Sequence, residues 1–141
     1  MGSAASVVIR RRIQWFDTDS STKYHNTAPL RLMEEAEAVL LDRLGLVRQV
    51  YGFLPRRRVE IDYFLPLRFW DEVHVGVEVS EVGRTSITYA FWIDRDGRRH
   101  AEGRVVAVHI DAEGRPRPWP EEHRRLLTAS GALEPPGAGG A

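Results

Sequence analysis

Four polar side chains that could perform nucleophilic or acid–base chemistry lie close together near the start of the chain. Asp17 and Asp19 are two positions apart in WFDTDSSTKYHN, residues 15–26, and His25 and Asn26 close the stretch. A carboxylate can act as a nucleophile or as a general base, and histidine exchanges protons near neutral pH. The stretch is therefore a candidate reaction centre, placed just before a helical pattern.

The same residues also have a structural interpretation. An aspartate can close an Asx-type turn or cap a helix, and spacing alone favours that role for both Asp17 and Asp19. His25 alone is typical of a loop histidine, and Asn26 is a good helix cap. The loop must therefore be weighed together with the elements that position it.

The segment TAPLRLMEEAEAVLLDRLG predicts one long helix. Asn26 or Thr27 can cap it, Pro29 suits its first turn, and Gly45 supplies its C-terminal stop. At about 100° per residue, one broad arc collects the apolar residues Leu30, Leu32, Met33, Ala36, Val39, Leu40, Leu41 and Leu44. So wide an apolar face indicates a helix that lies against a sheet.

Glu37 interrupts this apolar arc, between Leu30 and Leu44. One interpretation is structural: the side chain lies at the edge of the arc, where it reaches solvent or pairs with an arginine. The other is a buried carboxylate near the reaction centre. We keep Glu37 as a catalytic hypothesis beside the structural one.

The rest of the chain alternates with a period of two, which is typical of half-buried strands. Strands are expected at residues 6–14, 58–65, 73–82, 85–94 and 98–111, with a hairpin turn at Asp96-Gly97 and a short helix at 121–127. The order predicts an α+β fold in which four strands after the long helix form a meander and one helix covers the sheet. A single domain would span residues 1–129, and the Gly/Pro/Ala-rich segment 130–141 is expected to be a disordered tail.

Composition excludes several functional classes. Lys+Arg and Asp+Glu are both 20, so no net positive field favours nucleic acid. The chain has no cysteine, which excludes disulfides, thiolate zinc sites and cysteine nucleophiles, and its five histidines show no metal-ligand spacing. No apolar run reaches the roughly 20 residues of a membrane span, and no secretory signal is visible. We expect a cytoplasmic protein that binds no metal and no membrane.

The order of elements and several motifs together resemble a known family. The DTD before the helix, HNTAPLRLMEEAE, and IDYFLPLRFWDEVHV followed by VGRTSITY resemble hotdog-fold acyl-CoA thioesterases of the 4-hydroxybenzoyl-CoA thioesterase type, over roughly residues 7–127. The resemblance implies a long helix wrapped by a curved antiparallel sheet. It also implies a homodimer with active sites at its interface, commonly doubled to a homotetramer, and no cofactor beyond the CoA of the substrate.

The resemblance gives the residues of the opening stretch specific roles. It implies that Asp19 attacks the thioester carbonyl or activates water, while N–H groups near Asn26 hold the oxyanion. Asp17 is expected to orient the loop. Two positions depart from the family pattern, because Thr22 and Trp70 stand where glycine is usual. His25 matches a histidine of some relatives after a shift of one residue.

The substrate implied by the resemblance is an acyl-CoA, whose phosphates arginine side chains can bind. The candidate substrate contacts are Arg57 and Arg58 in an arginine triplet, Arg84 and Thr85 in GRTS, and the aromatic residues Trp15 and Tyr24. The structural alternatives are a solvated strand start for the arginines and apolar core for the aromatics. The expected activity is hydrolysis of acyl-CoA or acyl-carrier-protein thioesters. A binding protein without hydrolytic activity and a hotdog dehydratase are the alternatives, although the histidine and carboxylate arrangement of the latter is not found.

Overall fold

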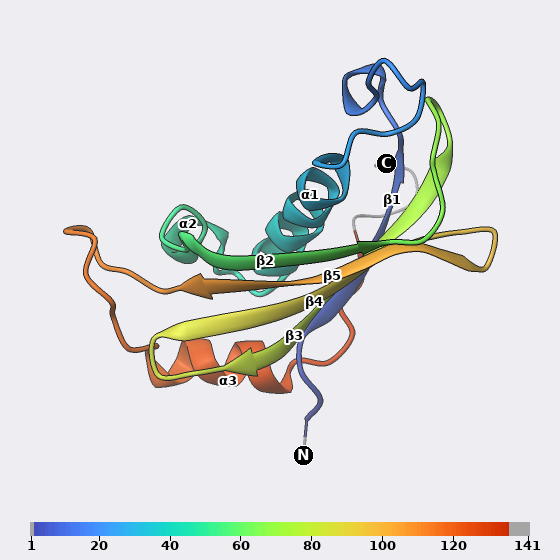
Figure 1. Cartoon of the computed structure of the whole chain (residues 1–141). Coiled ribbons are helices and arrows are strands. Elements are labelled where there is room, and N and C mark those ends of the chain that lie inside the picture. The colour runs from blue at the N-terminus through green and yellow to red at the C-terminus, as the bar shows by residue number, and fades with distance from the viewer. Residues whose placement is uncertain (1, 136–141) are drawn as a thin grey trace.

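The structure, a computed structural model, describes residues 2–135 as five strands and four helical segments (Figure 1). The elements in chain order are β1 (Ser6–Arg12), η1 (Trp15–Asp17), α1 (Ala28–Arg43), α2 (Val47–Val50), β2 (Arg56–Tyr63), β3 (Glu72–Val82), β4 (Ser86–Arg95), β5 (Arg98–Val108) and α3 (Glu121–Ala129). All five expected strands and both expected helices are present. The single turns η1 and α2 were not expected, because each is too short to produce a periodic pattern.

The strands form one antiparallel sheet in the order β1-β3-β4-β5-β2, and α1 crosses one of its faces (Figure 1). The α+β class and the hotdog arrangement are thereby confirmed. The expected four-strand meander is wrong: only β3, β4 and β5 follow one another, while β2 pairs with β5 at the far edge. Alternation of apolar residues reports that a segment is a strand, but it carries no information about the neighbouring strand.

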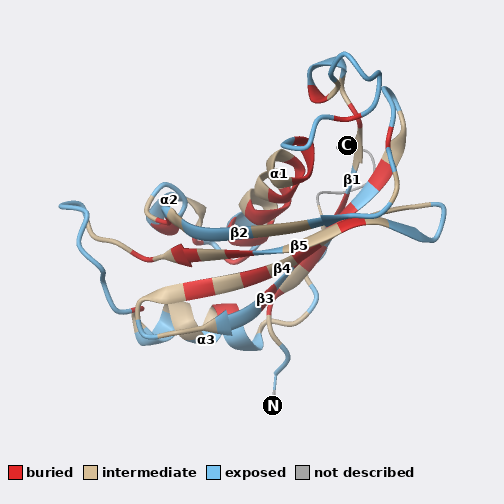
Figure 2. Cartoon of the chain, viewed as in Figure 1, coloured by how far each residue is buried: buried red, intermediate tan, exposed pale blue. Residues whose placement is uncertain are grey.

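The core lies between α1 and the sheet (Figure 2). The inward face of β3 carries Val73, Val75, Val77 and Val79, that of β4 carries Ile87, Tyr89, Phe91 and Ile93, and α1 contributes Leu32, Met33, Ala36, Leu40 and Leu41. All of these side chains are buried, as their periodicity predicted. Burial of each large one contributes about 1.5–3 kcal/mol, so this interface fixes the position of α1 and of the loop that precedes it.

The ends of α1 follow the expected signals at two positions and depart from them at one. Pro29 lies in the first turn, and Gly45 ends the helix with a φ of +75°, a conformation that favours glycine. The expected side-chain cap is wrong, because Thr27 occupies the cap position without a capping bond and Asn26 lies outside the helix. The ring of His25 accepts the Thr27 N–H in place of a cap, with Nδ1 at 3.1 Å from the nitrogen.

Two of the three non-glycine residues with positive φ among residues 2–135 are those that depart from the family pattern. Thr22 has a φ of +69° and Trp70 a φ of +74°. A left-handed conformation costs a residue with a Cβ roughly 1–2 kcal/mol, and β-branched threonine tolerates it poorly. The backbone therefore keeps the shape that glycine would favour, although the side chains differ.

Replacing Thr22 with glycine is expected to stabilise the protein by about 0.5–1 kcal/mol. Relief of the left-handed strain outweighs the extra freedom that glycine gains in the unfolded chain. Urea unfolding of Thr22→Gly measures the difference, and Thr18→Gly, where φ is −100°, is the control that should lose stability. A loss of stability in both variants would contradict the strain at Thr22.

The C-terminal segment is ordered further than its composition suggested. Residues 131–133 lie against β1, where Ser6 N–H donates to the Gly131 carbonyl at 3.1 Å and the Leu133 N–H donates to the Ser6 carbonyl at 2.7 Å. The expected start of a disordered tail at residue 130 is therefore wrong, and positions 136–141 lie outside the described residues. α3 packs beside β3 and buries Leu127. Among the described helices, none has the length and apolar character needed to cross a membrane.

Candidate active site

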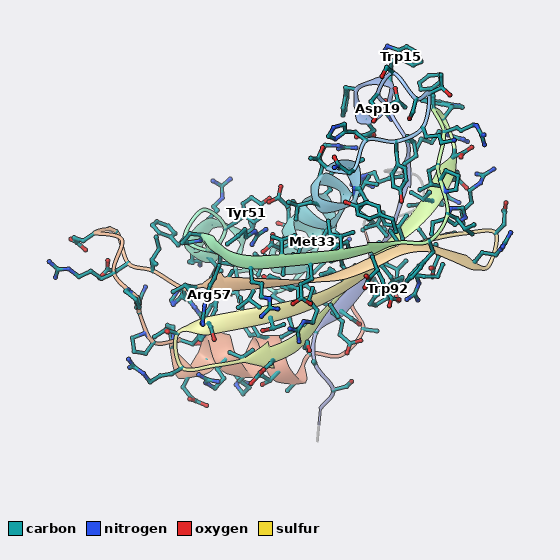
Figure 3. The ribbon with its side chains drawn as sticks, in the orientation of Figure 1. Trp15, Asp19, Met33, Tyr51, Arg57 and Trp92 are labelled. Atoms are coloured by element: carbon teal, nitrogen blue, oxygen red, sulfur yellow. The ribbon has the colours of Figure 1, made fainter. Side chains whose placement is uncertain are left out.

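The stretch singled out in the sequence forms a loop between β1 and α1 at one tip of the molecule, where Figure 3 shows Trp15 and Asp19. A second loop, residues 64–71 between β2 and β3, supports it. The Tyr24 N–H donates to the Leu67 carbonyl at 2.7 Å, and the main chain of Lys23 forms an isolated antiparallel β-bridge with that of Arg68. Two loops far apart in the sequence thus hold the residues just before α1.

Asp19 is an exposed, ionised carboxylate on this loop. Its Oδ1 accepts hydrogen bonds from the Ser21 N–H at 2.8 Å and from the Ser21 hydroxyl at 2.5 Å. The Ser21 hydroxyl, the Ser21 N–H and nearby His25 lower the pKa of Asp19 against the opposing effect of desolvation. An anionic carboxylate at neutral pH can act as a nucleophile or a general base, but not as a general acid.

Replacing Ser21 with alanine is expected to move the acid limb of the pH–activity profile to higher pH. The Ser21 hydroxyl bond is the largest cause that lowers the pKa of Asp19, so loss of the hydroxyl raises this pKa back towards its ordinary value. A kcat/KM profile of Ser21→Ala from acidic to neutral pH measures the shift. Ser20→Ala, one residue away, is the control, and coincident profiles for both variants and the wild type would contradict the role of Ser21.

Asp17 is buried and held from several sides, unlike Asp19. Arg31 of α1 donates through Nε to Oδ1 at 2.6 Å and through Nη2 to Oδ2 at 2.8 Å, and the Gln14 N–H donates to Oδ2 at 2.7 Å. The carboxylate is only 1% exposed. These contacts place Asp17 in a structural position beneath the loop, and its oxygens face the protein instead of solvent.

His25 and Asn26 lie at the end of the loop that contains Asp19, just before α1, and His25 is near enough to lower the pKa of Asp19. Nδ1 of His25 accepts the Thr27 N–H, so in the neutral ring the proton is on Nε2. The Asn26 carbonyl accepts a hydrogen bond from the Tyr63 hydroxyl of β2. The Ala28 N–H donates to the His25 carbonyl at 2.9 Å, whereas the Asn26 N–H has no hydrogen-bond partner within residues 2–135. A donor thus remains available on the same loop as Asp19, at the start of α1.

The aromatic candidates differ in burial. Trp15 is 72% exposed and meets the Phe69 ring edge-on, with centroids 5.5 Å apart. Tyr24 is buried against Tyr63, and desolvation together with Tyr63 raises its pKa to about 12. Tyr24 therefore belongs to the core that supports the loop, and Trp15 lies on the open surface beside Asp19.

The structure does not bring the four polar substrate candidates to Asp19 within one chain. Arg57 and Arg58 are exposed at the beginning of β2, and Figure 3 shows Arg57 far from Asp19. Arg58 pairs with Glu60 at 2.6 Å. Arg84 and Thr85 form the β3–β4 turn, at the end of the sheet away from the loop (Figure 1). Within the chain, the expected arginines therefore do not lie beside the candidate residues of the loop.

Glu37 lies in the middle of α1 and is fully buried. Arg56 of β2 donates to both of its oxygens, through Nη1 to Oε2 at 3.0 Å and through Nη2 to Oε1, and it also contacts Glu34 at 3.3 Å. Burial opposes the charge of Arg56, but these two carboxylates outweigh it and raise the pKa of Arg56. A cavity of about 360 Å³ opens beside the cluster, lined among others by Tyr51 and Ile110. The arginine partner agrees with the structural interpretation of Glu37, but the expected position at the edge of the arc is wrong, because the side chain is fully buried as the other interpretation expected.

Sequence reasoning missed four residues of this region. Ser21, Arg31, Arg56 and Tyr63 each bond to a residue of the candidate site. The position of Ser21, two residues after an aspartate, is a recognisable turn signal. The other three act across the fold, and local sequence contains no signal for them. Within the described part of the chain, no group of three or more His, Cys, Asp or Glu side chains could hold a metal ion.

Comparison with known proteins identifies the family of the chain. The family model described as thioesterase-like superfamily matches residues 13–127, so the chain belongs to that superfamily. A comparison with curated protein sequences gives no significant match. One similar solved structure is a thioesterase from Thermus thermophilus in complex with coenzyme A and Zn, at 30% identity and a TM-score of 0.76, over 85% of this chain and 90% of that chain. A second is a predicted thioesterase from Bacillus stearothermophilus, at 25% identity and a TM-score of 0.76, over 86% of this chain and 93% of that chain. A third is a 1,4-dihydroxy-2-naphthoyl-CoA thioesterase from Synechocystis, at 18% identity and a TM-score of 0.77, over 86% of this chain and 95% of that chain.

Proposed function

We propose that this member of the thioesterase-like superfamily hydrolyses an acyl thioester of CoA or of an acyl-carrier protein, and releases the free acid and the thiol. The observations that carry the proposal are the ionised Asp19 and the Asn26 N–H on the same loop just before α1; this N–H is a donor without a partner among the described residues. Thioester hydrolysis needs an oxygen nucleophile and a donor for the developing oxyanion, and these two groups supply them.

In the proposed reaction, Asp19 either attacks the thioester carbonyl carbon or removes a proton from a water molecule that attacks it. A C–O bond forms, the carbonyl oxygen becomes an oxyanion, and the C–S bond then breaks to release the thiolate, which takes up a proton. In the nucleophilic route, water subsequently hydrolyses the mixed anhydride and regenerates Asp19. Thioester and water supply all the atoms, so the reaction requires no resident cofactor.

The Asn26 N–H is the proposed oxyanion donor, helped by the positive end of the α1 dipole. The Nε2–H of His25 can donate to the substrate carbonyl or to the attacking water, because Nδ1 is held by the Thr27 N–H. Asp17 stays outside the reaction in this proposal, since its carboxylate oxygens are occupied by Arg31 and Gln14.

We propose that a homodimer completes the site. β2 is an edge strand whose outer side is unpaired within the described chain, and it exposes 39% of Val59 and 47% of Tyr63. Such an edge is a template for pairing with a second copy. The partner would then bring arginines equivalent to Arg57 and Arg84 towards the CoA phosphates, because the chain's own copies lie away from Asp19.

A thiol-release assay over a panel of aliphatic and aromatic acyl-CoAs tests the proposal. Hydrolysis of at least one member with saturation kinetics is expected. Acyl-CoA binding measured by calorimetry without any thiol release would contradict hydrolysis and would indicate the non-hydrolytic binding protein instead. The same panel presented on an acyl-carrier protein distinguishes the two carriers.

A further inference from the structure

Arg31 of α1 lies outside the apolar arc of the helix and makes a two-point contact with Asp17. Its Nε and Nη2 donate to the two oxygens of Asp17 at 2.6 and 2.8 Å, which is the side-on bidentate geometry of a strong arginine–carboxylate pair. The carboxylate is 1% exposed and the arginine side chain 35%. The carboxylate is therefore withdrawn from water while the arginine is partly exposed, unlike an ordinary surface ion pair in which both groups are solvated.

Asp17 connects the two ends of the loop that contains Asp19. At one end its carboxylate accepts the Gln14 N–H at 2.7 Å. At the other end its main-chain carbonyl accepts the His25 N–H at 2.5 Å. Asp19 lies between these two attachment points, and its N–H donates to the Lys23 carbonyl at 3.2 Å. Any movement of Asp17 would therefore be transmitted to both Asp19 and His25.

Arg31 is itself fixed on α1. Nη1 donates to Glu35 one turn further along the helix, and the guanidinium lies over the Phe16 ring, 4.9 Å from its centroid. Burial opposes the charge of Arg31, but Asp17 and Glu35 outweigh it and raise the pKa of Arg31. The arginine thus remains charged and is held in one orientation on α1. Because α1 is itself packed on the sheet, Arg31 is a fixed point for the loop.

We propose that Arg31 is a positioning residue of the reaction: it acts through Asp17 to hold Asp19 and His25 in place over the start of α1, without touching the substrate. This inference rests on the proposed function. It differs from a purely stabilising role because the pair ties the loop to the helix whose N-terminus supplies the oxyanion donor. Misplacement of a reacting group by about 1 Å can cost about a hundredfold in rate, so the orientation of the loop affects kcat.

The experiment compares four variants of the full chain. Arg31→Gln removes the charge and the bidentate contact, and Arg31→Lys keeps the charge with a single donor point. The double variant Asp17→Asn with Arg31→Gln removes both charges. Arg43→Gln, an exposed arginine in the last turn of the same helix, is the matched control. Steady-state kcat and KM, circular dichroism, and hydrogen exchange of the His25 amide are measured for each variant.

For Arg31→Gln we expect kcat to fall by about 10- to 100-fold, KM to change by less than about threefold, and the His25 amide to lose its protection from exchange. Arg31→Lys should recover part of the lost kcat. In the double variant kcat should fall by about the same factor as in Arg31→Gln, because the two residues act as one unit. Arg43→Gln should match the wild type in all three measurements.

Wild-type kcat and an unchanged exchange rate at His25 in Arg31→Gln would overturn the inference, as would a loss that appears in KM alone. If a variant does not fold, Arg31→Lys provides the same comparison with the charge retained. Should the wild type release no thiol from any acyl thioester, the proposed function fails on its own. The exchange of the His25 amide still decides in that case whether Arg31 orders the loop.

Discussion

Replacing Asp19 with asparagine is expected to lower kcat/KM at least about a hundredfold, because general bases contribute about that much and nucleophiles more. The amide keeps the size and part of the hydrogen bonding to Ser21, but it has no negative charge to attack the carbonyl or to take a proton from water. Since Asp19 is exposed and, among the described residues, makes its side-chain bonds only to Ser21, the fold should be unaffected.

The measurement is thiol release under saturating and subsaturating acyl-CoA, together with a thermal unfolding curve. Asp42→Asn is the matched control, because Asp42 is also exposed and lies at the other end of α1. Near-full activity in Asp19→Asn would show that the carboxylate is neither nucleophile nor base. A large loss of activity in the control as well would point to a general effect of removing a negative charge.

Replacing Arg56 with methionine is expected to lower the free energy of unfolding by about 3–5 kcal/mol, the largest stability effect that the structure indicates. The variant leaves the fully buried Glu37 carboxylate without its arginine partner, next to the Tyr89 hydroxyl, which is also buried. Desolvation and the Glu37 carboxylate raise the pKa of Tyr89, so this hydroxyl stays protonated but cannot replace two arginine donors.

Urea unfolding of Arg56→Met measures this loss. The nearby Arg58→Met is the control, since Arg58 pairs with Glu60 on the surface and such pairs contribute about 1 kcal/mol or less. Replacing both members of the buried pair, Glu37→Leu with Arg56→Met, should restore much of the lost stability. If Arg56→Met and Arg58→Met unfold at the same urea concentration, the buried pair is not a stabilising contact.

The same pair allows a test of the catalytic hypothesis for Glu37. Glu37→Gln keeps the shape of the side chain and one acceptor for Arg56, so the fold should tolerate it better than loss of the arginine. Unchanged turnover in this variant would exclude a catalytic role for Glu37. A loss of turnover at unchanged stability would instead extend the site along α1 towards the cavity beside Tyr51.

The sequence predicted those parts of the fold that depend on local patterns. The alternation in β3 and β4, the apolar arc of α1 and the two-residue turn at Asp96-Gly97, where φ is +51° and +73°, are each set by residues adjacent in the chain. Side-chain period and backbone conformation are local properties, so they can be inferred without the tertiary structure. The motifs around Asp19 likewise indicated the family.

What could not be inferred was how distant segments meet. The arginine triplet illustrates this, because a register shift between Arg56 and Arg58 sends Arg56 inwards to Glu37 while Arg57 and Arg58 stay exposed. The three residues are identical in type and adjacent in sequence. A shift of one position in a strand moves a side chain to the other face, and only the pairing of β2 with β5 determines it.

The two aspartates of the opening stretch differ for the same reason. By itself the sequence determined that two carboxylates precede a helix with a broad apolar face, and that this order resembles thioesterases. Only the tertiary structure decided that Asp17 is withdrawn from water beneath Arg31, while Asp19 faces solvent and makes no ion pair within the described residues. Burial and ion pairing depend on which elements pack together, and α1 brings Arg31 to Asp17 across fourteen positions of the chain.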